Sequence, residues 1–224
     1  MRILGIDTSS KNFSLGLFKD GRAYSYNLET GAKLSGLILE AITETVNSTG
    51  CKIGEIDYFA CGLGPGSFTG IRIGVSVIKA LSWSLRKPSF GFSSLDVIAR
   101  NMAFSDGYIA VVTDAKRGLV YHGLYRIKDH SCLRVGKLKL ANIDSILSGI
   151  KHKCIFTGDA ISFYKEKILN SRKCSALADK DMWYPKGHNI INLCLERVKK
   201  PFKEDLNPIY LYPENCQVKR VNVS

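Results

Sequence analysis

Two aspartates each end a short apolar segment, a position from which carboxylates often serve phosphate and metal chemistry. Asp7 closes the segment 2–7 and is followed by the hydroxyls of Thr8 and Ser9, and Asp114 closes the segment 108–114. Two such turns facing each other across a cleft would offer amides and hydroxyls to phosphate and carboxylates to hydrated magnesium. The alternative is that each aspartate only closes a turn at the end of its strand.

A glycine-rich loop lies where a strand gives way to a helix. Gly64, Gly66 and Gly70 allow close approach of the backbone, and Ser67 or Thr69 can cap a helix whose uncovered amides attract an anion. The lysine that a Walker loop carries after its last glycine is missing. Two interpretations stay open, an anion-binding loop and a tight turn whose glycines serve backbone geometry alone.

Two helices are predicted on either side of this loop. Apolar residues at helical spacing run from Leu34 to Val46, and a second helix runs from about Thr69 to Arg86. The second helix has small residues four apart on one face and a separate apolar face, so it needs two neighbours. The sheet and the first helix can supply them, and another subunit would cover any apolar surface left over. An entirely intramolecular pair is the alternative.

The two halves of the chain repeat one order of elements. Each half reads as apolar or alternating strands, a helix, a strand and a second helix, with strands predicted at 2–7, 13–18, 24–28, 57–63, 108–114, 119–127, near 133–140 and at 154–157, and the later helices near 143–150 and after Asp159. These patterns predict an α/β fold of two related β-β-β-α-β-α units. The boundary is expected near residue 107, which gives a first subdomain 1–107 and a second subdomain 108–224.

Composition and charge narrow the class of protein. The chain has 224 residues, 45% hydrophobic and 23% charged, with a net charge of +12. Arg72 and Lys79 interrupt the longest apolar stretch, and Asp7 stands where a signal peptide needs apolar residues, so we expect a cytoplasmic protein without a membrane segment. Lys and Arg exceed Asp and Glu by 21 to 11 in residues 108–224 but by only 11 to 9 in residues 1–107. The excess suits a nucleic-acid partner, and a basic surface with no specific ligand is the alternative.

Hydrolytic and zinc chemistry have little support in the sequence. The four histidines form no H-x-x-x-H pair that would place two imidazoles on one helical turn, and there is no G-x-S-x-G nucleophile motif. We therefore predict no metal site and no catalytic residue.

Three blocks, at 3–9, 64–74 and 114–121, resemble the TsaB family, also called YeaZ. The middle block is the most specific, and the three together extend from Met1 to about Tyr125. The segment 207–211, Asn-Pro-Ile-Tyr-Leu, is similar to the family's closing Pro-x-Tyr-Leu.

The resemblance implies an actin-like (ASKHA, ribonuclease H-like) fold and a part in bacterial synthesis of N6-threonylcarbamoyladenosine (t6A), which lies beside the anticodon of tRNAs that read codons beginning with A. In that system TsaD transfers the threonylcarbamoyl group, the ATPase TsaE joins the assembly, and TsaB is a scaffold that lacks the metal-binding histidines of TsaD. The chain is thus expected to be non-catalytic and to meet tRNA through the complex. No cofactor is expected to bind tightly, with ATP, ADP and magnesium only in the assembled complex.

The resemblance also implies site residues. The first two helices become the surface that pairs with TsaD, or with a second copy when the chain is alone, through Leu34, Leu37, Ile38, Ala41, Ile42, Gly70, Gly74, Val77 and Leu81. Phosphate or nucleotide contacts are expected at Asp7, Thr8, Ser9, Gly64, Gly66, Ser67, Thr69 and Asp114. Two other functions stay open: a stand-alone actin-like ATPase or small-molecule kinase that uses the two aspartates, and a tRNA-binding module built on the basic second half.

Overall fold

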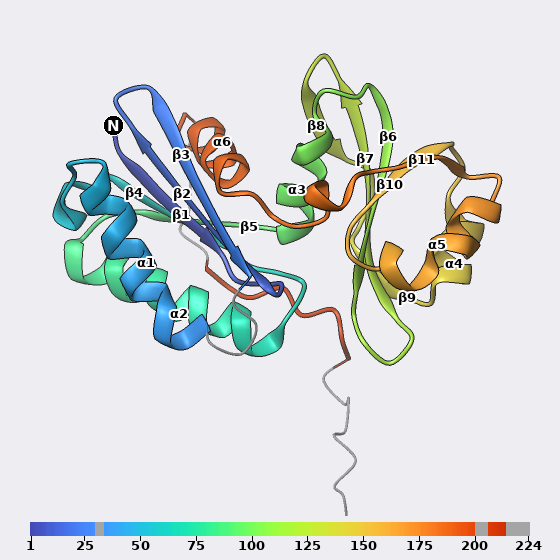
Figure 1. The fold of residues 1–224 in the computed structure, drawn as a ribbon, viewed down its shortest axis with the longest axis horizontal. Coiled ribbons are helices and arrows are strands. Elements are labelled where there is room, and N and C mark those ends of the chain that lie inside the picture. Colours follow the sequence, from blue (N-terminus) through green and yellow to red (C-terminus); the bar gives the residue numbers. More distant parts are fainter. Residues whose placement is uncertain (30–33, 200–205, 214–224) are drawn as a thin grey trace, which may run out of the picture.

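The computed structural model describes residues 1–29, 34–199 and 206–213. Figure 1 shows two β-sheets side by side, each covered by helices, which we call the first and second lobes. No helix within these described ranges has the length and apolarity needed to span a bilayer.

The sheet of the first lobe has the strand order β3-β2-β1-β4-β5. Its strands are β1 (Ile3–Asp7), β2 (Asn12–Lys19), β3 (Arg22–Glu29), β4 (Tyr58–Gly62) and β5 (Ser89–Phe92). The first three form an antiparallel meander, because Asp20 and Gly21 adopt positive φ angles in the hairpin turn, and β4 and β5 add in parallel after helical crossovers. The predicted three strands, helix, strand and helix of this half are confirmed.

The sheet of the second lobe repeats this plan in the order β11-β10-β6-β7-β8. Its strands are β6 (Gly107–Asp114), β7 (Val120–Lys128), β8 (Ser131–Arg134), β9 (Lys139–Ala141), β10 (Cys154–Thr157) and β11 (Cys174–Leu177). The single strand predicted near 133–140 is wrong in detail, because Gly136 adopts a positive φ there and divides it into β8 and β9, both paired with β7. Two related units are nevertheless present, as predicted.

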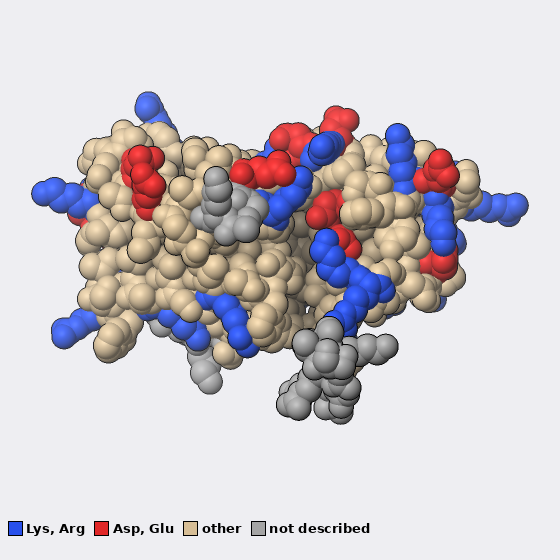
Figure 2. All heavy atoms as spheres, turned by 60° about the horizontal axis from the view of Figure 1, so that its bottom comes forward, with Lys and Arg blue, Asp and Glu red and all other residues tan. Residues whose placement is uncertain are grey.

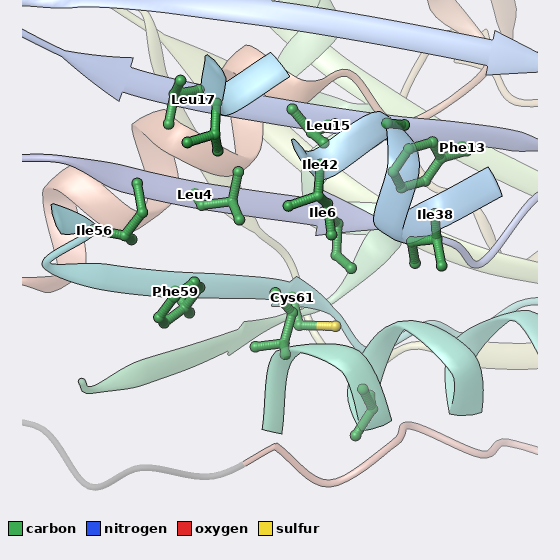
Figure 3. Packing of buried hydrophobic residues seen from close by; sticks show 14 of the residues in the cluster. Leu4, Ile6, Phe13, Leu15, Leu17, Ile38, Ile42, Ile56, Phe59 and Cys61 are labelled. Carbon is green, nitrogen blue, oxygen red and sulfur yellow. The ribbon is translucent and has the colours of Figure 1, made fainter. Parts of the chain in front are cut away.

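Helices cover both sheets. They are α1 (Leu34–Ser48), α2 (Phe68–Leu85), α3 (Ser94–Ala99), α4 (Ile143–Gly149), α5 (Ile161–Asn170) and α6 (Gly187–Arg197), with short 3-10 turns at Ile53–Glu55, Arg100–Met102 and Lys180–Met182. Both α1 and α2 lie on one face of the first sheet (Figure 1). Figure 3 shows Ile38 and Ile42 of α1 directed at the strands, where they are 2% and 3% exposed. This burial accounts for the periodicity that predicted α1.

The last helix crosses back to the first lobe. Although α6 falls within the range 108–224, it packs on the face of the first sheet that α1 and α2 leave free, with Ile190, Ile191 and Cys194 buried against Ile3 and Ala60. A division at residue 107 therefore separates α6 from the sheet that it covers. The first lobe is built from both ends of the chain.

Two glycines make this crossing close. A β-carbon on Gly16 of β2 would overlap the carbonyl of Gly187, and one on Gly187 would overlap the carbonyl of Leu15. The Ser14 hydroxyl, on the same strand, donates a hydrogen bond to the Pro185 carbonyl just before α6. The start of α6 thus lies directly on the backbone of β2.

We expect Gly187→Ala to destabilise the protein, because the added methyl group must push α6 away from β2. Overpacking of this kind costs about 1–3 kcal/mol in the free energy of unfolding, which lowers the melting temperature by several degrees. Gly54→Ala is the matched control, since a β-carbon there would meet no atom within 4 Å. Thermal and urea denaturation measure both. Equal melting temperatures for the two variants would contradict the contact between α6 and β2.

Candidate functional site

Asp7 ends β1 in an enclosed position. Its side chain is 0% exposed, and Oδ1 accepts hydrogen bonds from the amide and the hydroxyl of Ser9 at 2.8 and 2.6 Å. A β-carbon on Gly62 of β4 would overlap Oδ2. Burial raises the pKa of Asp7, and hydrogen bonds from Ser9 and Ser94 offset this only in part. The carboxylate therefore holds a turn and does not face solvent.

The glycine-rich loop is wrapped around that turn. The Ser67 amide donates to the Ser9 carbonyl at 2.7 Å, and the Gly64 carbonyl accepts from the Ser94 amide at 2.8 Å. A β-carbon on Gly66 would overlap the Ser9 carbonyl. The Ser67 hydroxyl caps α2 by accepting from the Gly70 amide at 3.2 Å. The loop geometry thus matches the second interpretation, glycines that serve close backbone contact.

The glycine face of α2 points into the same turn. The Thr8 hydroxyl donates to the Gly70 carbonyl at 2.8 Å, and β-carbons on Gly70 and Gly74 would overlap the carbonyl and the hydroxyl of Thr8. Both glycines are buried. The small residues that suggested a docking face are therefore occupied within this molecule.

Asp114 occupies the matching corner of the second lobe. It is half-buried, and its carboxylate accepts from the amide and the ammonium group of Lys116 at 2.8 and 2.6 Å. Its own amide donates to Oδ1 of Asp159 at 2.9 Å, and burial raises the pKa of Asp159. The oxygens of Asp114 are thus committed to their own turn. Because Asp7 is enclosed as well, the two carboxylates do not fit a shared magnesium site.

A cleft of about 570 Å³ separates the lobes. Four of the predicted phosphate residues line it, namely Ser9, Gly66, Ser67 and Asp114, whereas Asp7, Thr8 and Gly64 lie beneath its surface and Thr69 is exposed outside it. The sequence reasoning missed most of its walls, which are Lys11, Phe68, Lys116, Tyr121, Asp159, Trp183, Tyr184 and Tyr212. Asp159 had a signal, a glycine and an aspartate after a strand, and Phe68, Lys116 and Tyr121 lie within the blocks 64–74 and 114–121. The aromatic residues come from distant segments and share no spacing.

The cations of this cleft are already neutralised. Lys11 pairs with Glu29 at 2.7 Å, and Lys116 pairs with Asp114. Figure 2 shows acidic and basic side chains next to one another where the lobes meet. In the described ranges no cluster of three or more His, Cys, Asp and Glu side chains is arranged to hold a metal ion. The cleft is therefore an aromatic groove of mixed charge.

The predicted pairing surface is mostly buried in the structure. Four of its five α1 residues are between 2% and 8% exposed, namely Leu34, Ile38, Ala41 and Ile42, and only Leu37 is half-buried. In α2, Val77 and Leu81 are half-buried, whereas Gly70 and Gly74 face Thr8. The helices are those predicted, but these six buried residues belong to the core, because the strongest apolar periodicity marks the face that meets the sheet.

Comparison with known proteins agrees with this architecture. Residues 29–198 match the family model described as TsaD, tRNA N6-adenosine threonylcarbamoyltransferase. The chain is 31% identical to the tRNA threonylcarbamoyladenosine biosynthesis protein TsaB of Buchnera aphidicola from Schizaphis graminum, over 89% of this chain and 95% of that one. It is 32% identical to TsaB of Bacillus subtilis, over 75% of each chain. The crystal structure of YeaZ from Pseudomonas aeruginosa is 22% identical, covers 94% of this chain and 99% of its own, and superposes with a TM-score of 0.81.

Two lobes of one strand order around a cleft define a protein of the actin-like (ASKHA) fold. Within that class, the identity and coverage of the matches to TsaB proteins determine the family. The chain belongs to the TsaB (YeaZ) family.

The raised pKa of Asp7 predicts a specific pH dependence. The native state holds this proton more tightly than the unfolded chain, so the stability it contributes is complete below the ordinary pKa of 3.8 and is lost as pH rises through the folded value. Asp7→Asn keeps the acceptor for Ser9 but cannot ionise. We therefore expect this variant to gain free energy of unfolding relative to wild type as the pH rises above about 4.

Asp20→Asn, at an exposed turn position, is the control and should follow the wild-type curve. Urea denaturation at a series of pH values measures all three proteins. Parallel curves for wild type and Asp7→Asn would show that Asp7 is solvated and would restore it as a candidate ligand in the cleft.

Proposed function

We propose that this chain is a non-catalytic scaffold subunit in the biosynthesis of tRNA threonylcarbamoyladenosine, next to the anticodon of tRNAs that read codons beginning with A. It would bind a catalytic subunit of the TsaD type and act with an ATPase of the TsaE type in the cytoplasm. The proposal rests on one observation: apolar side chains are partly exposed on the outer surface of α1 and α2.

We define the α1–α2 face by its residues: Ile73, Ser76, Val77, Ala80, Leu81 and Ser84 of α2, together with Leu37 and Leu39, which lie on the two flanks of α1 on either side of the buried Ile38. Ile73, Val77 and Leu81 form a half-buried row with four-residue spacing. Beside this row, the exposed Ser76, Ala80 and Ser84 are small and also four apart. A ridge next to a shallow groove is what a second helix needs to pack closely.

Two large side chains extend this face. Leu39 is 57% exposed and Trp83, near the end of α2, is 85% exposed. An exposed tryptophan at the edge of an apolar helix surface is typical of residues that dominate binding energy in protein interfaces. In the absence of the catalytic subunit, a second copy of this chain can cover the same face in an isologous homodimer.

The chemistry of the cleft supports a role without catalysis. Asp7 is enclosed, Asp114 is held by its own turn, and His122 is buried with its pKa lowered to about 4 by loss of solvation. Asp7 and His122 are thus not placed as solvent-facing acids, bases or metal ligands, and Asp114, which lines the cleft, is paired with Lys116. The threonylcarbamoyl transfer would therefore belong to the TsaD-type partner.

Ala80→Arg should weaken pairing with the catalytic subunit. Ala80 is exposed, so arginine can be placed without disturbing the monomer, but a bound helix would have to bury an unpaired charge. We expect the dissociation constant to rise at least tenfold, measured by co-purification and calorimetry with a TsaD-type protein. Gly74→Leu is unsuitable, because it would clash with Thr8 inside the monomer.

The matched control is Ala176→Arg, another exposed alanine, on β11 of the second lobe. It should bind the partner as wild type does. If Ala80→Arg also binds normally, the α1–α2 face is not the pairing surface and the proposal fails in its structural part.

The isolated chain should bind ATP and magnesium weakly or not at all. Both cleft lysines are paired, and the carboxylates are not available to hydrated magnesium. Isothermal calorimetry with millimolar MgATP on the isolated chain, and then on the purified complex with TsaD-type and TsaE-type subunits, measures this. We expect heat of binding only with the complex. Tight binding by the isolated chain would favour the stand-alone ATPase instead.

A further inference from the structure

One end of the second sheet gathers basic side chains from β7 and from the loops that precede β10 and β11. The parallel strands β6, β10 and β11 begin there, with Tyr108, Cys154 and Cys174 in register, and the antiparallel β7 ends there, with Arg126 opposite Tyr108. The residues that surround these positions, which we call the basic end, are Arg126, Lys128, Lys151, His152, Lys153, Arg172 and Lys173. The Cys154 amide donates to the Lys173 carbonyl at 2.8 Å, so the loops before β10 and β11 lie side by side.

An aromatic stack stands among these cations. The imidazole of His152 lies on the ring of Tyr108 with 4.0 Å between centroids and 1° between planes. The guanidinium of Arg126 lies 6.0 Å from the same Tyr108 ring. His152 and Arg126 are exposed, whereas Tyr108 is half-buried and packs against the core below. A rigid stacked pair therefore reaches the surface with a guanidinium beside it.

The cations of the basic end form no ion pair with any residue that the structure describes. Within the described ranges, no ion pair involves Arg126, Lys128, Lys151, Lys153, Arg172 or Lys173, although Lys167 pairs with Asp144 on the same lobe. The neighbouring acidic residues are Asp106 and Asp129, in the turns at this end. The local excess of positive charge is therefore open to an external anion.

We propose that the basic end binds RNA directly, with its lysines and arginines on phosphates and the stack of His152 and Tyr108 receiving an unpaired base. Cations interleaved with a stacked aromatic pair match single-stranded or looped RNA, because every base offers a flat face and every nucleotide a phosphate. An acidic protein would use the charges but not the stack.

The position of the basic end fits the proposed scaffold function. The inference rests on that function for one point, that the bound RNA is a tRNA. The α1–α2 face belongs to the first lobe and the basic end to the second, so one chain can hold a protein partner and RNA together (Figure 1). The second half of the chain, which carries 21 basic against 11 acidic residues, would then serve the substrate, and the first half the catalytic subunit.

The test is fluorescence anisotropy of the full chain with an unmodified tRNA transcript across a series of salt concentrations. For K151E/K153E we expect at least tenfold weaker binding and a log–log salt slope smaller by about 1.5, since each lost phosphate contact removes about 0.7–0.9. For His152→Ala we expect about tenfold weaker binding with the slope unchanged, because stacking releases no counterions. All these side chains are exposed, and melting temperatures should match wild type.

The charge-matched control is K137E/K180E. Both lysines are exposed, and Lys180 follows the opposite end of β11. This variant should lose less than about twofold in affinity at moderate salt. Equal losses in the two double variants, or equally tight wild-type binding of heparin or polyglutamate, would overturn the proposal in favour of a general polyanion surface or an acidic protein partner.

Binding of the TsaD-type subunit is measured in parallel on the same proteins. The proposed scaffold function fails if wild type does not bind that subunit, whatever the RNA result. The RNA inference fails if K151E/K153E binds both the subunit and tRNA as wild type does.

Discussion

The contact between the glycine face of α2 and the turn after β1 sets the orientation of everything on that side of the first lobe. Gly66, Gly70 and Gly74 lie where any β-carbon would overlap Thr8 or Ser9, and Thr8 bonds the Gly70 carbonyl at 2.8 Å. The contacts of Gly70 and Gly74, four residues apart on one face of α2, leave the helix a single rotation about its axis. That rotation buries Ile71, Val75 and Ile78 against the sheet and directs Ser76, Ala80 and Ser84 outward.

The same contact changes what the predicted phosphate residues can do. Because the loop closes over the Ser9 carbonyl, and a β-carbon on Gly62 would overlap Asp7, part of the turn that would cradle a phosphate is filled by protein, although Ser9, Gly66 and Ser67 still line the cleft. The fold remains actin-like, and Asp7 at the tip of β1 belongs to the buried core.

The sequence predicted the elements better than their surroundings. Alternation and helical spacing located β1 to β4, α1, α2 and the strands around Asp114, since one face of each is buried. The glycines of α2 could not be assigned, because small residues four apart permit either a neighbouring helix or a backbone turn. The packing of α6 on the first sheet could not be predicted from local sequence patterns either, because its partners, Gly16 and Leu15, lie about 170 residues earlier.

The proposed scaffold function depends on binding surfaces more than on a cleft, and the two lobes carry different surfaces. The core-forming side of α1 and α2 is fully used within the chain, so only their outer row can meet a partner without cost to the monomer. The second sheet has α4 and α5 packed over one face, and exposed basic side chains lie at one end of its strands. Protein contact on a helix face and polyanion contact at strand ends are therefore compatible on one chain, because they draw on different parts of the same repeated unit.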